Sequence, residues 1–128
     1  MKPTRIAMLL LSLSGIAFTA PSHAIANYGT YSSILWNTPG QHFTDDDWKL
    51  FESTLNNTLN TAKDGETRAW ANPATKASGE FTILRSVQRG DNSCREVKII
   101  SQAQGRRRVL GKAFCKQDDG TWKVVSGR

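Results

Sequence analysis

The sequence has few of the residue types that carry metal, redox or histidine chemistry. Its 128 residues include only 2 cysteines and 2 histidines. Two cysteines are too few for a small scaffold held together by disulfides, and they do not supply the four closely spaced ligands of a structural zinc site. Redox centres prefer a C-x-x-C spacing, which is absent here. These shortages argue against a metal-stabilised or redox-active domain.

Motifs typical of enzymes are also missing. The sequence contains no G-x-S-x-G nucleophile elbow, no phosphate-binding loop and no dinucleotide-binding fingerprint. His42 is the single histidine after residue 24, and it has no evident partner for a triad or a metal site. We therefore expect no catalytic, cofactor-binding or metal-binding residues, and a protein that is not an enzyme.

The length and composition indicate one small domain. The chain is 38% hydrophobic and 22% charged, a balance too mixed for a fully disordered protein. A chain of this length can bury a modest core but has no room for a second domain.

The first 24 residues have the layout of a secretory signal peptide. Lys2 and Arg5 form a basic start, an apolar stretch of about 13 residues follows, and small residues come after it. A membrane-spanning helix needs roughly 20 residues, so this stretch is too short to cross a bilayer. We expect cleavage that leaves a mature start at Ile25 or Asn27, with no transmembrane span in the mature chain.

Export determines how the cysteines are interpreted. Exported proteins meet an oxidising compartment, so the even pair Cys94 and Cys115 predicts a disulfide. Neither cysteine lies near the expected cleavage site, where a bacterial lipid anchor would be attached. We expect a periplasmic or secreted protein, with association to the outer membrane left open.

A helix is predicted over residues 44–62, after a flexible arm at 25–43. Thr44 suits the N-cap, and acidic residues 45–47 fill the first turn, where negative charge favours the helix dipole. Lys63 is expected in the last turn. Apolar residues recur at helical spacing and predict one buried stripe: Trp48, Phe51, Leu55, Leu59 and Ala62. The acidic triplet has no acid–base partner in this segment, so we interpret it as helix capping and not as a catalytic pair.

Strands are predicted in the rest of the chain. Five runs rich in strand-forming residues are separated by polar turns, at 66–71, 80–87, 94–103, 106–116 and 121–125. The predicted class is α+β, with one N-terminal amphipathic helix packed on an antiparallel β-meander of four to five strands. We assign this domain to residues 44–126.

The cysteine spacing predicts the register of the central hairpin. If Gln104 and Gly105 form a two-residue turn, Cys94 lies directly opposite Cys115 at a non-hydrogen-bonded site. Cα atoms at such sites are about 4.5 Å apart, which is within reach of a disulfide. The same register places four apolar residues on the face expected to meet the helix: Val97, Ile99, Leu110 and Phe114. Glu96, Lys98 and the cystine lie on the other face, and a bulge would shift this by one residue.

Basic residues are concentrated in the second half of the chain. Residues 85–128 hold eleven bases and four acids, and Arg106, Arg107 and Arg108 sit beside the predicted turn. Two interpretations stay open. The arginines can be a solvated tip that keeps an edge strand from aggregating. They can also contact an anionic envelope glycan or lipid, such as lipopolysaccharide. Nucleic acid is not expected as a partner, because export separates the protein from it.

An ordered set of short segments resembles a known family. The segments are GETRAWANP at 65–73, SG at 78–79, CRE at 94–96, GKAFC at 111–115 and DGTWKV at 119–124. Over residues 63–126 they resemble the C-terminal domain of the 17-kDa bacterial outer-membrane surface antigen family. Members are typically lipoproteins with a glycine-rich segment, whereas this chain has the predicted helix in that place.

The resemblance implies an exported envelope protein without catalytic residues. It favours an interaction or structural module whose partner is an unknown envelope protein. The alternative is a binding module that recognises an anionic envelope glycan or lipid through its basic sheet.

Overall fold

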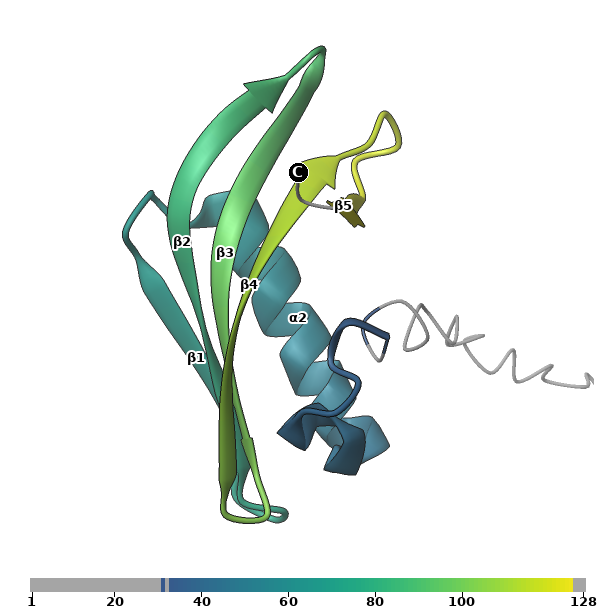
Figure 1. The fold of residues 1–128 in the computed structure, drawn as a ribbon, viewed down its shortest axis with the longest axis vertical. Helices are drawn as coiled ribbons and strands as arrows, with labels where there is room; N and C mark the ends of the chain where they lie inside the picture. Colours follow the sequence, from purple (N-terminus) through teal and green to yellow (C-terminus); the bar gives the residue numbers. More distant parts are fainter. Residues whose placement is uncertain (1–30, 32, 126–128) are drawn as a thin grey trace, which may run out of the picture.

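The computed structural model describes Tyr31 and residues 33–125. It shows one long helix packed on a curved five-stranded antiparallel sheet (Figure 1). The class is therefore α+β, as the sequence predicted. The elements are η1 (Pro39–His42), α2 (Asp45–Thr61), β1 (Thr67–Asn72), β2 (Ala77–Arg89), β3 (Asn92–Ala103), β4 (Arg106–Lys116) and β5 (Trp122–Val125). The strands pair in chain order as a meander. The expected signal peptide and both candidate mature starts lie outside the described residues.

Helix α2 begins with the predicted cap. The Thr44 hydroxyl accepts a hydrogen bond from the Asp47 N–H at 3.2 Å, and the Asp47 carboxylate accepts one from the Thr44 N–H at 2.9 Å. This reciprocal capping box satisfies two donors that the first turn leaves free. The helix ends at Thr61 with Ala62 as its C-cap, so Lys63 lies beyond the last turn and not within it. All five residues of the predicted stripe are buried.

The long helix is not the first element of the described chain. It is preceded by the 3-10 helix η1, and Tyr31 and Leu35 before η1 are both buried. The Tyr31 ring packs against Phe51 of α2, with centroids 6.0 Å apart. The described part of the segment expected as a flexible arm is therefore packed into the domain, because its apolar side chains complete the core. Residues 25–30 and 32 of that segment lie outside the described residues.

The register of the β3–β4 hairpin agrees with the prediction. Cys94 pairs with Cys115, and Ala103 pairs with Arg106 next to the turn. Gln104 and Gly105 have φ values of 50° and 72°, the positive pair that a tight two-residue hairpin turn requires. The register irregularity falls between β2 and β3 instead, at Leu84, whose side chain is exposed.

One face of the sheet carries the core. Val97, Ile99 and Phe114 are fully buried on it, and Leu110 packs against them at its margin. Helix α2 lies mainly over β1 and β2, while η1 lies over β3 and β4. The predicted apolar face therefore meets both helices, and not α2 alone. Within residues 31 and 33–125, no helix is long and apolar enough to span a membrane.

Candidate functional site

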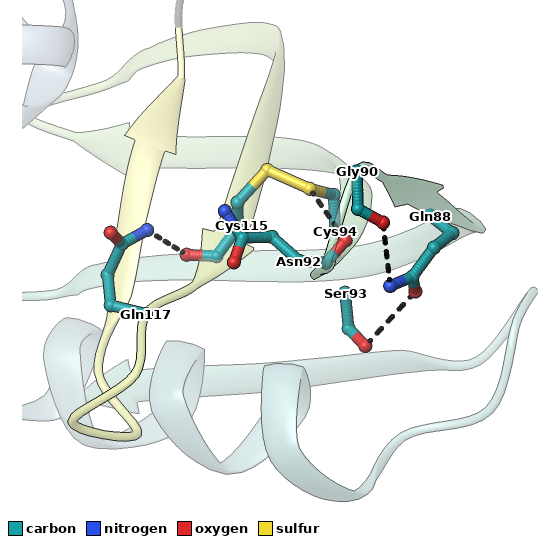
Figure 2. The surroundings of a disulfide bond; sticks show 7 residues. All are labelled: Gln88, Gly90, Asn92, Ser93, Cys94, Cys115 and Gln117. Atoms are coloured by element: carbon teal, nitrogen blue, oxygen red, sulfur yellow. Dashed lines mark hydrogen bonds between the residues drawn. A yellow bond between two sulfur atoms is a disulfide. The ribbon is translucent and has the colours of Figure 1, made fainter.

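The disulfide joins neighbouring strands on the face of the sheet that points away from the helix. Cys94 of β3 and Cys115 of β4 are bonded, with their Cα atoms 4.0 Å apart. Both residues are buried, and Figure 2 shows polar groups around them. The Gln117 amide donates to the Cys115 carbonyl at 3.0 Å, and the Gln88 amide donates to the Gly90 carbonyl in the β2–β3 turn. The bond therefore fastens the hairpin in its observed register.

Arg95, next to the disulfide, binds the end of the helix. Its guanidinium donates to the main-chain carbonyls of Thr58 at 3.3 Å and Leu59 at 2.8 Å, and also to that of Ala62. It further contacts the carboxylate of Asp64 at 3.4 Å. The last carbonyls of a helix have no partners within the helix and carry partial negative charge, so a cation that binds them caps the helix. Arg95 therefore acts in folding, although the sequence analysis assigned it no role.

Asp47 connects the start of the helix with the turn between β1 and β2. Beyond the capping box, its carboxylate accepts hydrogen bonds from Asn72 and from Thr75, each at 2.7 Å. Burial by itself would raise the pKa of Asp47, but the hydrogen bonds from Thr44, Thr75 and Asn72 outweigh it and lower the pKa. Asp47, the buried member of the acidic triplet, thus forms the helix cap that the sequence predicted.

A tryptophan occupies the space over a glycine in the sheet. Trp70 of β1 pairs directly with Gly79 of β2. A Cβ added at Gly79 would lie 2.5 Å from the Trp70 indole nitrogen and 2.7 Å from the Ile100 carbonyl oxygen. The indole N–H is buried and has no hydrogen-bond partner in the described part of the chain. Trp70 therefore acts by packing, and the glycine makes room for it.

Histidine and metal chemistry have no site in the described residues. His42 is exposed at the end of η1, and its ring lies 3.3 Å from the Gln41 side-chain amide. No group of His, Cys, Asp or Glu side chains suited to a metal ion occurs among residues 31 and 33–125. Trp122 lies in the core, where its indole donates to Asn60 of α2 at 2.9 Å.

The three arginines of the predicted basic tip do not form a single patch. Arg106 and Arg108 pair with Ala103 and Ser101, whose side chains are buried on the helix side of the sheet. Side chains alternate along a strand, so Arg107 points to the opposite face. All three are exposed, and none makes an ion pair within the described chain.

Lys76 adds a fourth cation at this end of the sheet. The β1–β2 turn and the β3–β4 turn lie side by side, because a meander brings alternate turns to the same end (Figure 1). Together they line a surface hollow of about 410 Å³, whose polar residues are Thr75, Lys76, Gln102, Gln104, Arg106 and Arg107. We call these residues the basic hollow. Amide, hydroxyl and cationic groups in one hollow can bind an anionic group.

The sequence analysis missed Lys76. The signal that could have found it was the meander itself. Once five antiparallel strands in chain order are predicted, the first and third turns must lie at one end, and Lys76 is in the first of them.

The chain is similar to curated surface antigens. It is 30% identical over 91 residues to a "17 kDa surface antigen" of Rickettsia bellii strain RML369-C, and equally to a protein of the same name from Rickettsia bellii. The match covers 70% of this chain, and the chain spans 57% of the length of those relatives. No family model and no solved structure matches. The chain is thus similar to part of the rickettsial 17 kDa surface antigens.

Proposed function

We propose that this chain is an exported, non-enzymatic protein of the cell envelope that acts as an interaction or structural module. The observation that carries the proposal is its similarity to the 17 kDa surface antigens. The N-terminal signal pattern and the bond between Cys94 and Cys115 support export to an oxidising compartment. The buried carboxylate of Asp47 and the half-buried guanidinium of Arg95 both hold the helix to the sheet.

Fractionation of cells that express the full chain tests this proposal. We expect the protein in the periplasmic or envelope fraction, with an N-terminus at Ile25 or Asn27 and no reactive thiol. A control variant, Leu10→Arg, interrupts the apolar stretch and should leave the protein in the cytoplasm. Unaltered protein that starts at Met1 and carries two free thiols would contradict the proposal.

The basic hollow favours a second candidate function, in which the module binds an anionic envelope glycan or lipid. Arg106 and Arg107 are free of ion pairs within the described chain, and Lys76 lies beside them. Exposed cations without acidic partners keep their full attraction for phosphate or carboxylate groups. Such binding is expected to weaken as salt is added, because the Debye length falls to about 8 Å at physiological ionic strength.

Binding to lipopolysaccharide and to vesicles containing phosphatidylglycerol tests the second candidate. Changing Arg106, Arg107 and Arg108 together to Ser should abolish binding, and Lys76→Ser alone should weaken it. Changing three exposed lysines that do not line the hollow to Ser removes the same charge and should have little effect; these are Lys49, Lys63 and Lys123. Equal losses in both triple variants would mean that net charge, and not the hollow, attracts the anion.

A further inference from the structure

Among residues 31 and 33–125, no strand pairs with the outer edge of β4 along most of its length. Strand β5 pairs only with Ala113–Lys116. Within the described chain, residues 106–112 therefore have a hydrogen-bonded neighbour on the β3 side alone. In Figure 1 this stretch is the lower part of β4, below β5. A strand edge of this kind presents main-chain donors and acceptors that can pair with another extended segment.

The turn determines which main-chain groups point outward. Ala103 and Arg106 flank a two-residue turn, so they form a hydrogen-bonded pair. Pairs alternate along an antiparallel ladder, so Arg106, Arg108 and Leu110 direct their N–H and C=O groups toward β3. The groups of Arg107, Val109 and Gly111 point away from it. The same alternation continues into Ala113 and Cys115, which pair with β5.

The side chains of this edge are accessible and carry charge of one sign. Strand β4 contains five basic residues and no acidic residue. Val109 is 45% exposed, and a Cβ added at Gly111 would meet nothing within 4 Å. The outer face of β4 is therefore open at these two positions, and an incoming strand would lie beside rows of cations.

The charges select the kind of segment that can pair. A second copy of β4 would bring arginine next to arginine, and like charges directly opposite each other are destabilising. Acidic side chains on the incoming strand would instead pair with Arg106 and Arg108 on one face and with Arg107 on the other. We propose that the free edge of β4, at residues 106–112, accepts an extended acidic segment of a partner protein as a sixth strand.

The geometry also specifies the pattern of the segment. Arg106, Arg108 and Lys112 project to the same face of the sheet, since they are an even number of residues apart. Acidic residues at alternate positions of the partner would lie beside them. Between Arg107 and Gly111, the exposed Val109 favours an apolar residue on the outer face. Main-chain bonds would supply affinity and the alternating side chains would supply specificity, as in other strand-addition complexes.

This inference rests on the proposed role as an interaction module. Its test uses purified, oxidised protein, so the result of the test does not depend on the compartment in which the protein resides. The probe is the labelled peptide acetyl-TEVEVET-amide, and binding is followed by fluorescence anisotropy at low salt. We expect binding that protects the amides of Arg107, Val109 and Gly111 from hydrogen exchange. A peptide N-methylated on the amides of one edge, and one with Gln in place of Glu, should each bind at least tenfold more weakly.

Two variants of one residue provide the matched comparison on the protein side. Val109→Pro removes an outward N–H without removing a bond to β3, and should weaken binding at least tenfold. Val109→Ala keeps the N–H and shortens only the apolar side chain, so it should bind the peptide much more tightly than Val109→Pro does. Both should unfold at nearly the same temperature as the unaltered protein. If Val109→Pro does not fold, the N-methylated peptide still decides the question on the unaltered chain.

Three results would overturn the inference. The first is absence of binding. The second is equal binding of the N-methylated peptide, which would show attraction by charge alone, as in the anionic glycan or lipid alternative. The third is full protection of the amides of Arg107, Val109 and Gly111 in the free protein, which would show that the edge is already covered. Failure of the export proposal would appear separately, in the fractionation and thiol measurements.

Discussion

The guanidinium of Arg95 on β3 donates a hydrogen bond of 2.8 Å to the main-chain carbonyl of Leu59, near the end of α2. This contact is one of three that explain the structural role of the segment CRE at 94–96. Cys94 closes the hairpin to β4, Arg95 caps the helix, and Glu96 pairs with Arg85 of β2 at 2.6 Å on the outer face. Three consecutive residues thus connect β3 to three different elements.

Removal of the Arg95 side chain should destabilise the protein. Arg95→Ala leaves helix carbonyls without their charged donor, and hydrogen bonds to charged groups contribute about 1.5–3 kcal/mol. We expect the free energy of unfolding to fall by about 2 kcal/mol, measured by urea denaturation with circular dichroism. Arg107→Ala, at an exposed position on the adjacent strand, serves as the control and should change the free energy of unfolding by less than about 0.5 kcal/mol. Similar effects in both variants would contradict the capping role.

Asp47 should make stability depend on pH in acid. Its pKa is lowered in the folded protein, so the ionised carboxylate stabilises the fold at pH values above the unfolded pKa of about 3.9. That contribution is lost as the pH falls through the lower pKa of the folded state. Asp47→Asn should therefore be less stable than the unaltered chain at pH 7, with the difference shrinking below about pH 3.9, in urea titrations across this range.

Geometry gives the same expectation for Asp47→Asn. The two carboxylate oxygens serve Thr44 on one side and Asn72 and Thr75 on the other. An amide has one oxygen only, so it would direct an NH₂ group at a donor. Asp46→Asn is the matched control, because Asp46 is exposed and its ion pair with Lys49, at 3.4 Å, is also exposed and therefore contributes little to stability. A pH-independent difference for Asp47→Asn would contradict the role of its charge.

The disulfide should contribute substantially to stability. It joins residues 21 apart in the sequence, and closing a loop of that length stabilises by about 3 kcal/mol in the chain-entropy model. Urea titrations with and without a reducing agent measure this difference. Alkylation of the oxidised protein after unfolding should modify neither cysteine, because a disulfide has no free thiol. Two alkylated thiols would show that the bond does not form.

Gly79→Ala should destabilise the sheet by about 1–3 kcal/mol, the usual cost of an extra methyl group in a packed core. The added Cβ would press on the Trp70 ring and on the Ile100 carbonyl. Gly111→Ala is the control, because nothing lies within 4 Å of the new Cβ there. Combining Gly79→Ala with Trp70→Phe should cost less than the sum of the two single changes, since residues in contact are not additive. Additive costs in thermal denaturation would show that the ring does not occupy that space.

The local elements could be predicted because neighbouring residues determine them. The N-cap at Thr44 and the helical spacing of the apolar stripe identify α2 without any distant contact. The turn at Gln104 and Gly105 sets the register of β3 and β4, and that register alone places Cys94 opposite Cys115. It also implies that Arg107 faces away from Arg106 and Arg108, although the sequence analysis treated the three as one tip.

The remaining features depend on contacts between residues far apart in the chain. No local pattern indicates that Arg95 reaches the end of α2, or that Asp47 binds the turn containing Thr75. Nor does a local pattern indicate that Leu35 is buried, or that η1 after it lies over β3 and β4. The spacing of apolar residues and the residue types in the turns thus determined the secondary-structure elements and the hairpin register. Only tertiary packing decided how the helices lie on the sheet and, within the described residues, that β5 pairs with Ala113–Lys116 of β4, because these contacts join segments that each adopt their structure locally.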